Sequence, residues 1–210
     1  MTHPQIVRSK EPIRLFKSPF LEFFTHIHPA VVATIWTPVI LYFLVVAVVR
    51  RPHGVSWWIV PAGFAIGLVL WTLTEYTLHR FLFHFKPRTP WQERLAFLFH
   101  GVHHAQPQCK TRLVMPPVVS IPLALIAYGL FYLVVGLLLG APHWIAPLFA
   151  GELAGYLVYD MFHYATHHLR VRWRWFRYLR QYHMHHHTQT PDQRFGVTSP
   201  LWDIVFGTKP

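Results

Sequence analysis

The sequence predicts an all-α integral membrane protein, with four transmembrane helices in two hairpins and a cytoplasmic, histidine-rich helical cap that holds a dimetal site. Three observations lead to this fold class. Hydrophobic residues make up 53% of the 210 residues and charged residues only 13%. Four apolar runs are long enough to cross a bilayer. Ten of the 17 histidines fall into four short groups beside those runs.

The chain order of the elements follows from the apolar runs and the breaks between them. Residues 1–28 are expected to form an interfacial arm, and residues 29–210 a single membrane domain. The four spans are expected at about 29–49, 57–78, 117–139 and 143–162. Pro52 and Gly54 mark the turn of the first hairpin, and Gly140 and Pro142 that of the second.

The polar segments between the spans are expected to carry shorter helices. The KPRTP stretch at 86–90 ends the helix that leaves the second span, and 91–104 begins a new one. Residues 105–117, with three prolines, form a loop. The segment 170–180 (RVRWRWFRYLR) is typical of an amphipathic segment at a membrane surface with anionic lipid headgroups.

The positive charge predicts the orientation. The net charge is +11, and 17 of the 19 lysines and arginines fall on one side of the expected spans, leaving only Arg50 and Arg51 on the other. Because cytoplasmic loops carry the excess of lysine and arginine, both termini and the histidine groups are expected in the cytoplasm. The membrane would be the inner membrane of a bacterium or the endoplasmic reticulum of a eukaryote. No recognition module for nucleic acid is visible, so nucleic acid is excluded as a partner.

The histidine spacing predicts metal ligation. Side chains three or four residues apart share one face of a helix, and imidazole is a common ligand of transition metals. His79 and His84 are five apart, about 140° around an ideal helix, so they share an ion only if the helix ends or bulges there; otherwise they serve different ions. Ten rings suit two ions. The predicted ligands are His79, His84, His100, His103, His104, His163, His167, His183, His186 and His187.

Two carboxylates stand close to these groups within the expected spans. Glu75 lies one turn before His79, and Asp160 lies three residues before His163. Each is expected to accept a hydrogen bond from the free ring nitrogen of a ligand, which fixes its tautomer. Alternatively, Asp160 contacts metal-bound water, and Glu75 makes a structural hydrogen bond between helices.

The ligand set favours oxygen chemistry. Two-metal hydrolases usually add bridging carboxylates, whereas an all-histidine site where lipid chains arrive suits non-haem iron that activates dioxygen.

At these motifs the chain resembles the fatty acid hydroxylase/sterol desaturase superfamily, whose histidine order is HX4H, HX2HH, HX3H, HX2HH. Within it the chain is most similar to the fatty acid 2-hydroxylases. The resemblance covers roughly residues 55–210. Its most specific stretches are HGVHHAQPQCKTRLVMPP at 100–117 and FGVTSPLWDIVFGT at 195–208.

The resemblance implies an oxygenase that uses dioxygen to hydroxylate C2 of a long acyl chain, free or in a sphingolipid. It implies two metal ions per chain, with iron as the working metal and zinc as a possible occupant of purified protein. Tyr159 and Asp160 match a family pair that lies beside the third histidine group. Tyr156, Phe162 and Trp202 are expected to shape a tunnel for the acyl tail, or else to be ordinary packing aromatics.

The electron donor is expected to be a separate protein. Many eukaryotic relatives carry a fused cytochrome b5-like haem domain, for which residues 1–28 are too short, so no haem is expected in this chain. A cytochrome b5-like protein, or a ferredoxin with its reductase, would supply electrons from the cytoplasm. Segment 170–180 offers charge complementarity to an acidic donor, with lipid contact as the alternative.

Three other functions stay open. The first alternative is the reaction of a sterol oxidase or a carotenoid hydroxylase of the same superfamily. A divalent-metal transporter would place ligands near mid-membrane with access from both sides, whereas these histidines gather at one face. A metal-stabilised scaffold without turnover is the third alternative.

Overall fold

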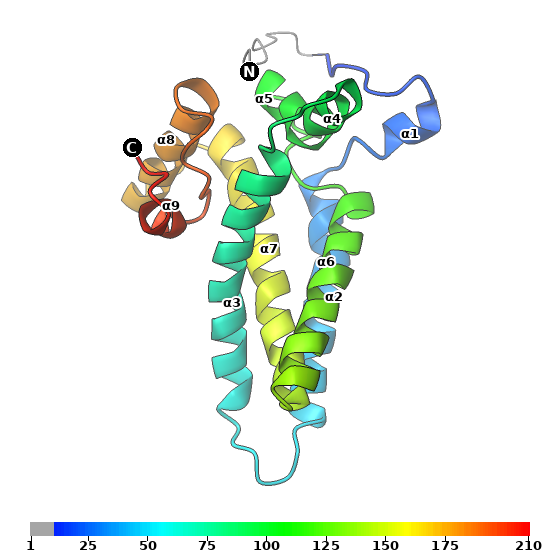
Figure 1. Ribbon diagram of the computed structural model, residues 1–210, viewed down its shortest axis with the longest axis vertical. Helices are drawn as coiled ribbons and strands as arrows, with labels where there is room; N and C mark the ends of the chain where they lie inside the picture. Colours follow the sequence, from blue (N-terminus) through cyan, green and yellow to red (C-terminus); the bar gives the residue numbers. More distant parts are fainter. Residues whose placement is uncertain (1–10) are drawn as a thin grey trace. The chain divides into compact units, whose positions relative to one another are not determined.

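The computed structural model describes residues 11–210, whose regular structure is entirely helical (Figure 1). In chain order the helices are α1 (Pro19–Phe23), α2 (Pro29–Val49), α3 (Ile59–Thr77), η1 (Leu78–Phe83), α4 (Pro90–Ala96), η2 (Phe97–Gly101), α5 (Val102–Ala105), α6 (Pro117–Phe131), η3 (Tyr132–Leu138), η4 (Pro142–Trp144), α7 (Ile145–His168), α8 (Arg174–Thr188) and α9 (Leu201–Val205). Helices α2, α4 and α6 each begin at a proline, which is favoured there because its missing N–H would have no intrahelical partner.

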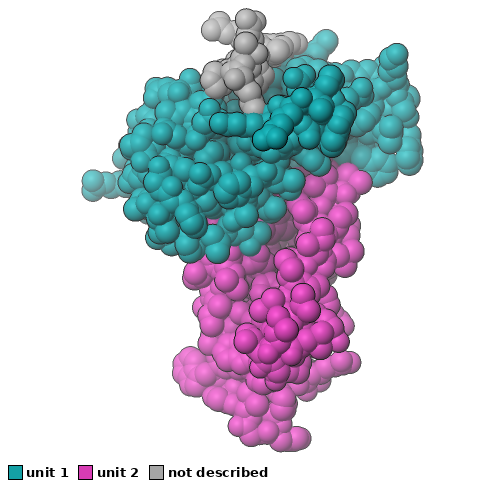
Figure 2. All heavy atoms as spheres, in the orientation of Figure 1, with its two compact units in different colours: residues 1–29, 73–114, 159–210 teal, residues 30–72, 115–158 magenta. Residues whose placement is uncertain are grey.

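The described residues form two compact units, coloured separately in Figure 2. Unit 1 holds residues 11–29, 73–114 and 159–210, and unit 2 holds residues 30–72 and 115–158. Each unit is built from segments far apart in the sequence. The predicted division into an arm at 1–28 and one membrane domain at 29–210 stays a prediction.

Unit 2 is a bundle of α2, α6 and the adjoining parts of α3 and α7, which run lengthwise beside one another (Figure 1). Aromatic rings join three of these helices. The Phe43 ring of α2 lies edge-on to Phe149 of α7 at 4.9 Å, and Tyr128 of α6 lies 5.2 Å from Phe149. The outer surface is apolar: Leu41 is 56% exposed, and Leu125 67%. Apolar side chains that face outward in this way are typical of a bundle surrounded by lipid.

Three helical stretches among the described residues are long and apolar enough to cross a membrane: Pro29–Val49, Ile59–Phe83 and Pro117–Leu138. They coincide with the first three predicted spans, with the second extending five residues further. Together with the apolar surface of unit 2, they make the chain an integral membrane protein.

The fourth predicted span differs from the other three. Helix α7 has 24 residues, long enough to cross a bilayer, but it is not one of the three sufficiently apolar stretches. Its acidic residues and histidines lower its mean hydropathy. The fourth span and the two-hairpin topology therefore stay predictions.

Helices α3 and α7 approach closely through glycines within unit 2. A Cβ added to Gly67 would lie 2.1 Å from the carbonyl oxygen of Leu148, and one added to Gly151 would lie 2.1 Å from that of Phe64. Small residues allow such contact between helix backbones in membranes, where packing rather than the hydrophobic effect holds helices together. These glycines set the α3–α7 distance.

Unit 1 contains two π-helical stretches, and both occur at histidine groups. In η1 the His84 amide donates to the His79 carbonyl oxygen at 3.1 Å, an i to i+5 bond. The predicted helix at 91–104 is observed as one continuous helical run, with η2 between α4 and α5. π-Helical turns widen a helix locally and are frequent at functional sites.

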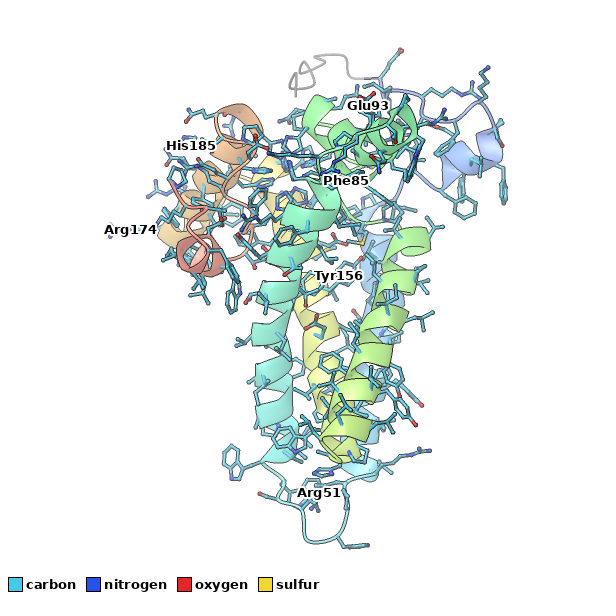
Figure 3. The ribbon with its side chains drawn as sticks, viewed as in Figure 1. Arg51, Phe85, Glu93, Tyr156, Arg174 and His185 are labelled. Carbon is cyan, nitrogen blue, oxygen red and sulfur yellow. The ribbon has the colours of Figure 1, made fainter. Side chains whose placement is uncertain are left out.

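Helix α8 is amphipathic. Its buried residues recur every three or four positions, as expected for a helix with one face on a core. They are Phe176, Leu179, Tyr182, His183 and His186. The arginines of its first half, including Arg174 (Figure 3), lie on the exposed side.

The N-terminal arm is tied to the loop that follows α5. Glu22 accepts hydrogen bonds from the amides of Leu15 and Phe16 at 2.9 and 2.8 Å, and from the Arg112 guanidinium at 2.6 Å. Burial raises the pKa of Glu22, but the two amides and the positive charge of Arg112 outweigh it, so the pKa is lowered from its ordinary 4.5. Ile13 also donates its amide to the Gln106 side chain at 2.8 Å. The described part of the arm is thus an ordered part of unit 1.

The close approach at Gly67 and Gly151 predicts that alanine destabilises the protein at these two positions but not at an open glycine position. Gly67→Ala and Gly151→Ala are expected to force α3 and α7 apart and to destabilise the protein by about 1–3 kcal/mol, the usual cost of overpacking. Gly129→Ala in α6, where an added Cβ meets nothing within 4 Å, is the matched control. Thermal unfolding in detergent measures the difference, and equal melting temperatures for all three variants would contradict the close approach.

The Glu22 contacts predict a pH-dependent arm. Because the folded-state pKa is lowered, the stabilising contribution is present above the ordinary pKa and is lost as the pH falls through the folded value. Hydrogen exchange of the Leu15 and Phe16 amides, corrected for intrinsic rates, is expected to accelerate below about pH 4.

Glu22→Gln is expected to accelerate exchange of the same amides at neutral pH. Glu93→Gln, at an exposed position of α4 (Figure 3), is the control and should leave both amides protected. Unchanged protection in the Glu22 variant would show that the arm is held by other contacts.

Candidate metal centre

The ten predicted ligands gather into two clusters within unit 1. In each cluster, five histidines present one nitrogen each, and these five nitrogens all lie within 4.8 Å of one another. The first cluster is His79, His84, His100, His104 and His186. The second cluster is His103, His163, His167, His183 and His187.

The ring nitrogens of each cluster converge on a common point. In the first cluster, the Nε2 atoms of His79 and His100 are 3.1 Å apart. In the second cluster, the Nε2 atom of His103 lies 3.0 Å from those of His163 and His187. Two nitrogens bound at about 2.1 Å to one ion, with a right angle between the bonds, would be about 3.0 Å apart. The observed spacing fits a transition-metal ion in each cluster.

The two clusters are neighbours, because two of the histidine groups divide between them. His100 and His104 join the first cluster, whereas His103 joins the second. In the fourth group His186 joins the first cluster, and His183 and His187 join the second. The centroids of the His104 and His187 rings are only 4.2 Å apart. Residues four apart on a helix therefore belong to one cluster, and the residue beside them belongs to the other.

The π-helix η1 resolves the unusual spacing of the first group. Each π-helical turn contains more residues than an α-helical turn, so residues five apart come closer to one face. His79 and His84 accordingly both belong to the first cluster. The condition that the helix must end or bulge for these two rings to share an ion is met.

Most of the ten rings are buried, and burial favours the neutral imidazole. Burial lowers the pKa of His103 and His183 well below 6.5, and neighbouring imidazoles lower both further. The pKa of His186 is lowered for the same reasons. Neutral imidazole is the form that binds a metal, so the donor set is ready at neutral pH.

The outer nitrogens of two first-cluster rings are fixed by backbone carbonyls. His79 donates from Nδ1 to the carbonyl oxygen of Phe195, and His186 donates from Nδ1 to that of Gln193 at 2.7 Å. These bonds hold the Nδ1–H tautomer and leave Nε2 free to bind an ion. The sequence does not reveal these two acceptors, because every residue has a backbone carbonyl and no residue type marks one that binds histidine. The family-specific FGVTSPLWD stretch, which begins at Phe195, was the nearest indication.

Glu75 lies near the site but acts on a different partner from the expected one. Its carboxylate accepts from the amides of Val197 and Thr198, at 2.6 and 2.9 Å, and from the Thr198 hydroxyl. The Nδ1 atom of His79, expected to reach Glu75, instead donates to the carbonyl oxygen of Phe195. Glu75 makes structural bonds, but to a loop rather than to another helix as its alternative had it.

The residues before the third histidine group lie beside the second cluster. The Tyr159 ring is buried and stacks on the His163 ring at 5.7 Å between centroids. Asp160 is 1% exposed and lies on α7 one turn before His163. Their catalytic or supporting roles stay predictions.

The three residues expected to line a tunnel are packed against aromatic neighbours. Phe162 lies 5.0 Å from the Phe176 ring, and Trp202 stacks on Phe206 at 5.9 Å. Tyr156 (Figure 3) belongs to unit 2, where its ring lies 5.6 and 5.4 Å from Trp36 and Trp71. These contacts account for the three positions by packing, and tunnel lining stays a prediction.

The comparisons with known proteins agree on one family. The family model described as fatty acid hydroxylase matches residues 64–208. Dihydroceramide fatty acyl 2-hydroxylase FAH2 of Arabidopsis thaliana is 38% identical over 208 residues, covering 99% of this chain and 84% of that protein. Ceramide very long chain fatty acid hydroxylase SCS7 of Saccharomyces cerevisiae is 39% identical over 193 residues, covering 90% of this chain and 47% of that protein.

A solved structure shares the fold. It is described as full-length scs7p with only the hydroxylase domain visible, and it superposes with a TM-score of 0.81 at 38% identity, covering 90% of this chain and 69% of that one. The chain therefore belongs to the fatty acid hydroxylase family, with fatty acid 2-hydroxylases among its relatives.

Proposed function

We propose that this protein is a membrane-bound, dioxygen-dependent monooxygenase that hydroxylates C2 of long acyl chains, as free fatty acids or within sphingolipids. One observation carries the proposal: ten imidazoles, mostly buried, form two adjacent five-membered clusters in a chain similar over 99% of its length to a dihydroceramide fatty acyl 2-hydroxylase. The similarity indicates the substrate class, and the clusters supply the metal site that such a reaction needs.

Each cluster would hold one ion through its five imidazole nitrogens. Iron is the proposed working metal, because it supplies the redox chemistry with dioxygen that insertion of oxygen into a C–H bond requires. Zinc suits nitrogen donors and would bind as well, but it has no redox chemistry.

The protein's own residues keep the site neutral, aligned and shielded from water. Burial disfavours protonation of the rings, so they remain donors at neutral pH. Tyr159, stacked on His163, holds that ring in place and closes one side of the second cluster. We assign Asp160 a supporting role there, as a group that tunes the ligands. Phe162, Trp202 and Tyr156 are kept as candidates for the wall that guides the acyl tail.

The topology that suits this reaction has four spans, with α7 as the fourth. Both termini and the metal centre would then face the cytoplasm, in the inner membrane of a bacterium or the endoplasmic reticulum of a eukaryote. The bias of lysine and arginine supports this orientation. Electrons would come from a separate cytochrome b5-like protein, or from a ferredoxin and its reductase.

The reaction is tested by lipid analysis of cells with and without the protein. Expression is expected to produce 2-hydroxy acyl chains, with the new oxygen derived from ¹⁸O₂. His186→Ala is expected to reduce product at least 100-fold, because it removes a ligand. His185→Ala, one position earlier on α8 (Figure 3) and outside both clusters, is the matched control and should retain activity. Hydroxylation at another carbon, or on a sterol or carotenoid, would overturn the assignment.

The metal content is tested on purified protein by elemental analysis. The wild-type chain is expected to hold close to two ions. Substituting three rings of one cluster with alanine, for example His163, His167 and His183, is expected to leave about one ion, because the other cluster keeps its five donors. Zero or one ion in the wild-type chain under saturating metal would contradict the dimetal centre.

A further inference from the structure

The C-terminal loop at 193–208 is folded around one buried carboxylate. Asp203, 0% exposed, accepts hydrogen bonds from the amides of Phe195 and Gly196, each at 2.8 Å, and from the Thr208 hydroxyl at 2.7 Å. Backbone bonds close the same loop, with the Arg194 amide donating to the Thr208 carbonyl at 3.0 Å. Such a loop is held by charge-assisted bonds, which are stronger than neutral ones.

A second carboxylate binds the backbone amides that directly follow those bound by Asp203. Glu75 accepts the next two amides, those of Val197 and Thr198. Four consecutive backbone N–H groups, 195–198, are thus bound by two carboxylates from different segments of unit 1. The backbone fits tightly, since a Cβ on Gly196 would lie 2.0 Å from the Ser199 carbonyl oxygen. The hydrogen bonds from these four amides therefore fix the position of the loop.

The carbonyl side of the same stretch faces the first cluster. Phe195 and Gln193 offer the oxygens that accept from His79 and His186. The Phe195 ring also lies edge-on to His84 at 5.6 Å. The histidine rings that this loop contacts, those of His79, His84 and His186, all belong to the first cluster.

The second cluster is supported differently. The Nδ1 atoms of His103, His167, His183 and His187 are buried and have no hydrogen-bond acceptor among the described residues. No loop carbonyl fixes their tautomer in the way that the C-terminal loop fixes His79 and His186. The C-terminal loop thus orients two rings of the first cluster and none of the second.

We propose that Asp203 and Glu75 are positioning residues for one ion only: they hold the C-terminal loop so that its carbonyls orient His79 and His186 in the first cluster. The proposal rests on the two-ion centre above. Outer hydrogen bonds of this kind typically change metal affinity 10- to 100-fold. Neutralising either carboxylate should weaken binding at the first cluster and spare the second.

The test is a titration of the metal-free, full-length protein in detergent with Co²⁺ alone, followed by absorption and by elemental analysis. The wild-type protein should bind two ions. Asp203→Asn and the milder Glu75→Gln should each bind one ion as tightly as wild type and the other roughly 10- to 100-fold more weakly. Asp192→Asn, which removes an exposed carboxylate one residue before this loop, is the matched control and should bind both ions normally.

Combined variants identify the weakened site. Asp203→Asn together with His84→Ala, both acting on the first cluster, should still bind one ion tightly. Asp203→Asn together with His167→Ala, a ligand of the second cluster, should bind none tightly. Size-exclusion profiles confirm that each variant is folded.

The outcomes separate the two proposals. Wild-type protein that binds fewer than two ions overturns the dimetal function itself. Two ions in the wild type, with Asp203→Asn and Glu75→Gln unchanged or with both ions weakened equally, overturn the positioning role alone. Equal weakening would mean that the loop supports unit 1 in general rather than one set of ligands.

Discussion

Everything in unit 1 depends on bringing ten neutral imidazoles together with their lone pairs facing inward. Nitrogens that face one another at 3.0–3.1 Å cannot all be satisfied by hydrogen bonds among themselves. An unsatisfied buried polar group costs roughly 1–3 kcal/mol, so each cluster has a free-energy cost that an ion at the shared point would offset. The binding free energy of the ion would then add to the folding free energy. The proposed ions would therefore stabilise unit 1 as well as serve the reaction.

The helices were predictable where a single physical rule decides the outcome. The first span was predicted at 29–49 and α2 occupies Pro29–Val49, because Pro29 starts the helix and unbroken apolar sequence continues it. The helical run before the second histidine group was also predictable, since a proline-containing break precedes it. The fourth span was harder to predict. A helix that carries carboxylates and imidazoles on a buried face has low hydropathy whether or not it crosses a membrane.

The ligand set could be predicted from spacing, but its division between two ions could not. Helical geometry places His100, His103 and His104 on neighbouring faces, and only the fold decides that His103 turns to the other cluster. The five-residue spacing of His79 and His84 left the η1 bulge open as one of two alternatives, and only the structure decides between them, since a π-turn depends on one inserted residue and not on a residue type. Glu75 was expected to reach an imidazole. The intervening loop, placed by a carboxylate at position 203 far along the chain, redirected it to two amides.

The interleaving of ligands along the chain has a topological consequence. His103 lies between members of the first cluster in sequence, and His186 lies between members of the second. No continuous stretch of polypeptide therefore contains one complete ligand set and none of the other. Truncating the chain at any point therefore cannot isolate one cluster intact and free of the other. Deleting the segment that carries either HX2HH group would remove donors from both clusters at once.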